Sequence, residues 1–202
     1  MSLKRDVEFL YEINCLRFIS RSWVQMLGPN FSNLAEHHLR VIWLALLIAK
    51  YEKKGDMGKI AQMALVHDVA ESRAGDVNYI GRLYITRNEN SAIADTFEGT
   101  ALREDMLKLW EEYEKRESIE AKIVKDADWL DVDIELKEQI AKGEEHLKAW
   151  RKSRDILVRK FYTKSGKKLW KAIWASTPSD WYVNAKNRFT HGDFKPTKKI
   201  KK

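Results

Sequence analysis

The sequence has little proline, glycine or cysteine, and each shortage excludes a kind of protein. With 3 Pro and 9 Gly in 202 residues, it offers few tight turns, which argues against a sheet of many strands and favours long helices. The single cysteine, Cys15, has no partner for an internal disulfide bond, which favours a reducing compartment. The longest apolar run, 41–49, is too short to cross a bilayer, and residues 1–30 lack the apolar run of a signal peptide. We therefore expect a cytoplasmic protein with no membrane partner.

The sequence does contain enough apolar material for a core. Hydrophobic residues make up 44% of the chain and aromatic residues 11%, which argues against general disorder. The length suits one domain with an appendage. We expect a single all-α domain over residues 1–176 and a basic, loop-like extension over 177–202, whose last residues, 195–202, are disordered.

The net charge of +7 is unevenly distributed along the chain. Residues 146–202 hold 17 Lys and Arg against 3 Asp and Glu, whereas residues 1–145 hold 20 against 27. A run of like charge commonly means a solvated helical face, which is the interpretation we favour. Such a run also attracts polyanions, so nucleic acid is a second, less favoured partner, and composition alone does not decide between the two.

Apolar residues recur at helical spacing along most of the chain. Asn33 followed by Glu36 predicts a capping box at the start of one helix, with Asn in place of the usual Ser or Thr. Gly75 is suited to end another helix, and Gly166 to break the last one. Residues 77–90 fit either a short helix or an ordered loop over a site. The predicted helices span residues 5–22, 33–53, 57–72, 91–116, 118–136 and 137–176.

Two polar side chains interrupt the apolar helix that begins near residue 57. His67 and Asp68 are adjacent there, and Glu71 lies one turn further on. Burying an imidazole beside a carboxylate is unfavourable unless a partner compensates both groups. A divalent cation does so, because it keeps the carboxylate ionised and the imidazole neutral. Taken alone, such a pair is more often a hydrogen-bonded contact in the core.

Two other apolar helices carry potential ligands as well. One holds His37 and His38, either of which could reach its apolar stripe, and the other holds Asp126 and Asp128. Three such helices can converge in the core of a bundle, as they do in carboxylate metal sites. Two imidazoles and two carboxylates carry a summed charge of −2, which matches one divalent ion. Mixed nitrogen and oxygen ligands suit Mn, Fe, Co, Ni or Zn.

The spacing of these residues resembles that of a known family. His37, His67-Asp68 and Asp128 are similar to the H…HD…D signature of the HD-domain superfamily. The run from His67 to Asp76, with Glu71 and Gly75 within it, is similar to the 5′-nucleotidase branch of that superfamily. The resemblance covers residues 16–131, and it implies an all-α HD-domain helical bundle with the metal site inside that range.

The same resemblance selects between neighbouring ligands. In this branch the first ligand follows an acidic residue and precedes an arginine by three positions, which implies His37 and not His38. The last ligand ends a Lys-x-x-Asp run, which implies Asp128 and not Asp126. The implied site therefore holds one divalent transition metal on four protein ligands: His37, His67, Asp68 and Asp128.

The activity implied by the resemblance is release of phosphate from (deoxy)nucleoside 5′-monophosphates through attack of a metal-bound water. Arg21 and Trp23 would meet the nucleotide, although this chain has one residue inserted between the members of the usual Arg-Trp pair. Glu71 and Asp76 are the candidate catalytic acids and bases, and Asp76 could instead hold the sugar hydroxyls. Beyond Asp76 the chain lacks the Pro found in many relatives, which bears on substrate preference.

Other functions and partners remain open at this stage. One alternative is another HD phosphohydrolase, acting on nucleoside triphosphates, alarmones or cyclic nucleotides. A second is a non-catalytic HD protein that binds a nucleotide or nucleic acid. Four tryptophans in the C-terminal part are expected to lie in the core or in a homodimer contact: Trp150, Trp170, Trp174 and Trp181.

Overall fold

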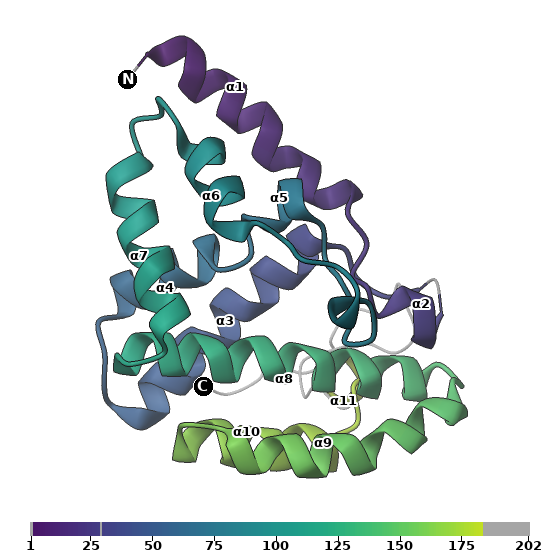
Figure 1. Ribbon diagram of the computed structural model, residues 1–202. Coiled ribbons are helices and arrows are strands. Elements are labelled where there is room, and N and C mark those ends of the chain that lie inside the picture. Colours follow the sequence, from purple (N-terminus) through teal and green to yellow (C-terminus); the bar gives the residue numbers. More distant parts are fainter. Residues whose placement is uncertain (1, 29, 184–202) are drawn as a thin grey trace, which may run out of the picture.

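The computed structural model describes residues 2–28 and 30–183, and helices without any strand make up this part of the chain (Figure 1). The all-α fold predicted from the sequence is confirmed. No helix in the described range is both long enough and apolar enough to cross a membrane. The α-helices are α1 (Leu3–Ile13), α2 (Val24–Leu27), α3 (Leu34–Glu52), α4 (Met57–Val66), α5 (Glu71–Ala74), α6 (Glu89–Phe97), α7 (Arg103–Lys115), α8 (Ile119–Ala141), α9 (Arg151–Leu157), α10 (Lys164–Ala175) and α11 (Asp180–Val183).

The long helix α8 is the centre of the molecule. In Figure 1 it separates α3, α4 and α7 on one side from α9 and α10 on the other. Its apolar residues pack between these two groups and are fully buried together with residues of α3 and α4. The side chains at this centre include Val41, Ile48, Ile60, Met63, Ile123, Val124 and Leu130.

The start of α3 follows the predicted capping box. The Asn33 side chain accepts a hydrogen bond from the Glu36 backbone N–H at 3.0 Å, and the Glu36 carboxylate accepts one from the Asn33 N–H at 3.1 Å. This reciprocal pair satisfies two of the donors that a helix start leaves without partners. It fixes where α3 begins, and therefore which of its side chains face the core.

Gly166 does not break a helix, and that prediction was wrong. The residue lies inside α10, and a Cβ atom there would come within 2.7 Å of an Asp126 carboxylate oxygen and 2.9 Å of the Thr163 hydroxyl. Glycine is therefore used for close approach between α10 and α8. The break falls earlier, between Lys142 and Thr163, where short helical pieces replace the predicted continuous helix.

Two further predicted helices also end at different places. The helix expected over 57–72 stops at Val66, and a turn separates it from the single-turn helix α5, which ends before Gly75 as predicted. The helix expected over 91–116 is divided into α6 and α7, with Gly99 at a φ of +71° between them. Residues 77–88 form a loop with one short 3₁₀ turn, Gly81–Leu83, which is the second of the two structures expected there.

The C-terminal part is described as far as Val183. Trp170 lies in the core, Trp150 and Trp174 pack against core clusters, and Trp181 lies in α11 with an exposed side chain. The proposed limit of the domain at residue 176 stays a prediction. The predicted disorder of residues 195–202 lies outside the described residues.

Candidate metal centre

Four side chains from three parts of the chain converge beside α8. His37 comes from α3, His67 and Asp68 from the turn after α4, and Asp128 from α8, and each offers a ligand atom within 4.8 Å of the others. The two imidazole Nε2 atoms are 3.2 Å apart. Asp68 Oδ2 lies 3.4 Å from His37 Nε2 and 3.3 Å from His67 Nε2, and Asp128 Oδ1 lies 3.4 Å from His37 Nε2. The structure therefore brings together the four residues that the sequence singled out.

The turn after α4 orients the first pair. His67 and Asp68 follow the end of α4 at Val66, and both contact His37 of α3. The His67 ring is held by its Nδ1 atom, which lies 2.8 Å from the Ala64 carbonyl oxygen. A carbonyl only accepts hydrogen bonds, so Nδ1 carries the proton and Nε2 presents its lone pair to the cluster.

The His37 ring is oriented by a carboxylate that sequence analysis did not identify. Its Nδ1 atom lies 2.7 Å from Asp131 Oδ2, and Asp131 in turn accepts a 2.5 Å hydrogen bond from Arg40 Nε. Arg40 also contacts Glu135, which accepts hydrogen bonds from the backbone and hydroxyl of Ser32. This chain of contacts fixes the ring from behind, as carboxylates do for many metal-bound histidines.

A pattern in the sequence could have revealed this support. Asp128, Asp131 and Glu135 recur at intervals of three and four along α8, so they share one face of that helix. A row of buried acids needs buried cations or a metal opposite it. Arg40, three residues beyond His37 on the facing helix, was a visible candidate.

Asp128 has a cation of its own. Lys125 Nζ lies 2.6 Å from Asp128 Oδ2, one helical turn away on α8. Burial opposes ionisation of Asp128, but the Lys125 charge outweighs it and lowers the pKa of the carboxyl below its usual value. Burial opposes ionisation of Asp68 as well, and the neighbouring imidazoles hold its pKa well below the usual range. Both carboxylates are thus ionised at neutral pH.

The donor set fits a divalent transition metal. Two ligand atoms that each lie about 2.1 Å from one ion, at a tetrahedral angle, are about 3.4 Å apart, close to the separations seen here. The Nε2 atoms of His37 and His67 face each other, while each Nδ1 is engaged elsewhere. Two lone pairs in contact repel unless a proton or a cation lies between them. A cation there would also meet the charges of Asp68 and Asp128.

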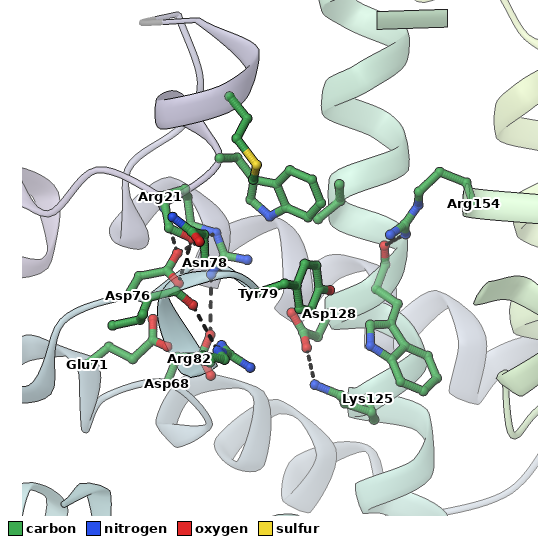
Figure 2. Close-up of a pocket in the computed structure, with 16 residues that line it drawn as sticks. Arg21, Asp68, Glu71, Asp76, Asn78, Tyr79, Arg82, Lys125, Asp128 and Arg154 are labelled. Atoms are coloured by element: carbon green, nitrogen blue, oxygen red, sulfur yellow. Dashed lines mark hydrogen bonds and ion pairs between the residues drawn. The ribbon is translucent and has the colours of Figure 1, made fainter. Parts of the chain in front are cut away.

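Beside this cluster the surface opens into a polar cavity. Figure 2 shows Arg21 and Asp76 at one side of it and Lys125 with Asp128 at the other. The loop after α5 contributes Asn78, Tyr79 and Arg82 to the wall. Trp23, the other substrate residue implied by the sequence, lines the same cavity and is otherwise buried.

Arg21 is held at the cavity by two carboxylates. Its guanidinium lies 3.4 Å from Asp68 and 3.6 Å from Asp76. Asp76 is fixed in turn by the backbone N–H of Ser22 at 2.9 Å and by the Ser22 hydroxyl at 3.1 Å. The insertion at Ser22 therefore does not remove Arg21 from the site, because the added residue contacts Asp76.

Glu71 lines the same cavity, and the pKa of its carboxyl is raised. Burial is the largest cause, followed by the charges of Asp68 and Asp76, and together they raise the pKa of Glu71 to about 9. Arg87 opposes this shift through a 2.9 Å hydrogen bond to Glu71 Oε1. The second oxygen, Oε2, is buried with no hydrogen-bond partner in the described chain. Without a metal, Glu71 therefore holds a proton at neutral pH.

His38 and Asp126, which were not selected as metal ligands, do not belong to the cluster. His38 is buried next to the His67 ring, with centroids 4.8 Å apart, but it does not belong to the ligand cluster. Asp126 faces away from the site and accepts hydrogen bonds from the backbone N–H groups of Tyr162 and Thr163, where α10 begins. His146 is on the surface, and His191 lies outside the described residues.

Comparison with known proteins gives consistent matches. Residues 13–175 match a family model described as an HD domain. The 5′-deoxynucleotidase HDDC2 of Danio rerio is 29% identical over 138 residues, which cover 65% of this chain and 68% of that protein. Two solved structures share the fold at a similar level of identity. A conserved hypothetical protein of Pyrococcus furiosus has a TM-score of 0.70 and 26% identity, covering 84% of this chain and 99% of its own. A predicted metal-dependent phosphohydrolase of Magnetospirillum magnetotacticum has a TM-score of 0.67 and 25% identity, covering 86% and 91%.

Proposed function

Because this chain belongs to the HD-domain family and is a metal-dependent phosphohydrolase, we propose that it releases phosphate from (deoxy)nucleoside 5′-monophosphates. The observation that carries the proposal is one cavity that is lined by Asp68 and Asp128 of the ligand cluster together with the cations of Arg21 and Lys125. Such a cavity suits a small dianion that is attacked at phosphorus. The similarity to the 5′-deoxynucleotidase of Danio rerio supports a nucleotide as the rest of the substrate.

His37, His67, Asp68 and Asp128 would hold one ion of Mn, Fe, Co, Ni or Zn, the metals that mixed nitrogen and oxygen ligands favour. When bound, such an ion lowers the pKa of water and polarises a phosphoryl oxygen. Asp131 keeps the His37 ring in the orientation that exposes Nε2, and the Ala64 carbonyl does the same for His67. The chain thereby presents four ligand atoms that need little rearrangement.

Arg21 and Lys125 bind and orient the phosphate. The planar guanidinium of Arg21 offers two donors to phosphate oxygens, and its contacts with Asp68 and Asp76 fix the plane. The ammonium of Lys125 approaches from α8 on the other side of the cavity, beside Asp128 (Figure 2). Together they offset the negative charge that the substrate adds to a site already rich in carboxylates.

Glu71 is placed to move a proton. Its carboxyl lies in the cavity, and burial together with the charges of Asp68 and Asp76 raises its pKa, which favours donation of a proton to the oxygen of the leaving sugar. Asp76 has a different environment, because its two oxygens already accept hydrogen bonds from Ser22. We therefore propose that Asp76 positions Arg21 and binds the sugar of the substrate.

We assign the aromatic side of the cavity to the nucleoside. Trp23 packs edge-on against Tyr79 with ring centroids 5.9 Å apart, and against Trp150 at 5.3 Å. Trp129 and Val132 complete an aromatic and apolar wall beyond Lys125. A flat base can pack on such rings whatever its hydrogen-bonding pattern.

The proposal is tested by a phosphate-release screen of nucleoside mono-, di-, tri- and cyclic phosphates with each divalent metal in turn. We expect release from 5′-monophosphates and none from 3′-monophosphates. His67→Ala, measured in parallel, controls for contaminating phosphatases and should be inactive and free of metal. Hydrolysis confined to triphosphates, alarmones or cyclic nucleotides would overturn the substrate assignment. It would still agree with a metal-dependent phosphohydrolase.

A further inference from the structure

Three of the four cationic side chains that line the cavity are paired with acids in the described chain. The pairs are Arg21 with Asp68 and Asp76, Lys125 with Asp128, and Arg154 with Asp133. The fourth cation, Arg82, is exposed and forms no ion pair within the described residues. Its charge is therefore available to an anion that enters the cavity.

The loop after α5 holds Arg82 in place. Its Nε atom donates a 2.8 Å hydrogen bond to the Val77 carbonyl oxygen, and its guanidinium carbon lies 5.9 Å from the centre of the Tyr79 ring. The Asn78 side chain tightens the turn by accepting a 2.8 Å hydrogen bond from the Gly81 N–H. A Cβ atom at Gly81 would lie 2.8 Å from a Val77 methyl carbon, so a larger residue there would displace Val77. Because Nε is engaged with the loop, the two terminal nitrogens of Arg82 remain for a ligand.

A phosphate group fits the atoms that Arg82 leaves available. A guanidinium binds two phosphate oxygens at once through two parallel N–H groups. In the view of Figure 2, Arg82 lies between Asp68 and Lys125 among the side chains that line the cavity. Arg21 precedes α2 and Lys125 lies on α8, so Arg82 comes from a third part of the chain. Three cations from separate segments thus border the cavity to which we assign the phosphate.

The charge of the cavity is consistent with a third cation for the phosphate. The three aspartates that line the cavity carry −3, whereas the proposed divalent ion, Arg21 and Lys125 carry +4. Glu71 and Arg154 are left out of this count, because each is paired with a residue of opposite charge that does not line the cavity. The balance is +1 without Arg82 and +2 with it, and a phosphate monoester dianion carries about −2. Arg82 therefore supplies the charge that makes the cavity and the dianion neutral together.

We propose that Arg82 binds the substrate phosphate together with Arg21 and Lys125, and that it favours the doubly charged phosphate of a monoester over the singly charged phosphate of a diester. This inference rests on the proposed function only in requiring that the cavity takes a phosphate group. It does not depend on the nucleoside. Arg82 acts on the binding of the substrate, since its guanidinium is fixed to the loop and not to a metal ligand.

The test is the dissociation constant of inorganic phosphate for the metal-loaded protein, measured by titration calorimetry at constant salt. Arg82→Gln removes the charge and should weaken phosphate binding about tenfold, the factor that corresponds to one charge-assisted hydrogen bond. Arg82→Lys keeps the charge and should recover most of this affinity. With a nucleoside 5′-monophosphate as substrate, the loss in Arg82→Gln should appear in KM more than in kcat.

The matched control is Arg17→Gln. Arg17 is also exposed, lies over an aromatic ring, that of Phe18, at 4.4 Å, and forms no ion pair within the described residues, but it does not line the cavity. This variant should bind phosphate as the wild type does. Far-UV circular dichroism and metal content should be unchanged in all three variants, which shows that the fold and the metal site are retained.

Dimethyl phosphate, a diester with a single charge, tests the selectivity as a competitor of inorganic phosphate. Arg82→Gln should lose affinity for phosphate and much less for dimethyl phosphate, so the preference for phosphate falls. An unchanged preference would overturn the selectivity. A wild-type protein that binds no phosphate, an Arg82→Gln variant that binds it as tightly as the wild type, or an Arg17→Gln variant that is equally weakened would overturn the role of Arg82. If Arg82 is needed for phosphate binding but no nucleoside monophosphate is hydrolysed, the proposed function fails and this inference stands.

Discussion

At the scale of single residues, neighbouring side chains of the same type have different roles, because only one of each pair faces the metal cluster. His37 and His38 are adjacent on α3, and both are buried, yet only His37 Nε2 lies among the carboxylates. We expect His37→Ala to remove metal from the protein, and His38→Ala to leave metal bound while lowering the melting temperature. Metal analysis of the two purified variants checks this, and loss of metal from the His38 variant alone would show that the ligand assignment is wrong.

The same contrast applies to Asp126 and Asp128 on α8. Asp128→Ala should lose metal, whereas Asp126→Ala should retain it and lose stability, because Asp126 holds the start of α10 through Tyr162 and Thr163. Removing a buried hydrogen-bond acceptor costs about 1–3 kcal/mol. Denaturant unfolding together with metal content separates the two roles.

A substitution at Asp131 tests whether a residue that does not bind the metal itself affects the metal affinity of the site. Asp131→Asn keeps the size of the side chain but loses the charge that orients His37 and pairs with Arg40. We expect metal affinity to fall by about 10- to 100-fold with the fold retained. Competition with a metal chelator measures the affinity, and Glu138→Gln, at the exposed end of the same ion-pair group, is the matched control. Equal affinities in the two variants would mean that Asp131 has no part in holding the ion.

The acids at the cavity provide a third test at this scale. Glu71→Gln and Asp76→Asn should keep the metal and lower turnover by about 10²-fold or more. The two variants should differ in KM, since Asp76 also holds Arg21 and Glu71 does not contact it. Steady-state kinetics with a nucleoside monophosphate decides the matter, and two fully active variants would make these carboxylates structural.

At the scale of elements, α8 is joined to the C-terminal helices by one buried ion pair. Arg154 of α9 donates to both oxygens of Asp133, at 3.0 and 2.7 Å, and the indole N–H groups of Trp170 and Trp174 donate to the same carboxylate. Breaking such a pair leaves a buried charge, at a cost of about 3–5 kcal/mol. Arg154→Met should therefore lower the free energy of unfolding by several kcal/mol, whereas Arg159→Met, on the exposed side, should change it by less than about 0.5 kcal/mol.

Truncation at Leu136 extends the same argument. It removes Arg154, Trp170 and Trp174 together and exposes the side of α8 that they cover. We expect insoluble protein from that variant. A soluble, metal-loaded product would show that the ion pair is not needed to complete the core.

The elements also show how far the sequence could predict the fold. The core helices, the capping box of α3 and the convergence of three helices on one site followed from apolar spacing and from the His and Asp residues that interrupt it. The end of α4 at Val66 and the continuity of α10 through Gly166 did not, because each depends on a tertiary contact. For Gly166 that contact is with Asp126, a residue 40 positions away in sequence. Lys125 was missed because its role appears only once Asp128 is in place, whereas the spacing of Asp131 on α8 was visible in the sequence.

At the scale of the whole molecule, the residues assigned to the proposed chemistry precede the basic C-terminal end in sequence. Each candidate ligand and acid lies at or before Asp128, and Arg154 is the only basic residue of the C-terminal part, within the described chain, that lines the cavity. Deleting 195–202 should therefore leave turnover of a monophosphate within about twofold of the full chain. A deletion variant that remains folded and metal-loaded but inactive would mean that these lysines hold the substrate. Salt-sensitive binding of nucleic acid that is lost with the deletion would be purely electrostatic.

The buried acids of α8 also affect the order in which the chain can fold. Asp126, Asp128, Asp131, Asp133 and Glu135 are all buried within a stretch of ten residues. In an isolated helix, repulsion between acids three and four residues apart opposes folding, and in the described chain Lys125 is the one lysine of α8 that forms an ion pair with any of them. The other compensating groups arrive with α3, α9 and the start of α10. The longest helix of the described chain is thus a poor folding nucleus by itself, and its formation is tied to the docking of the helices around it.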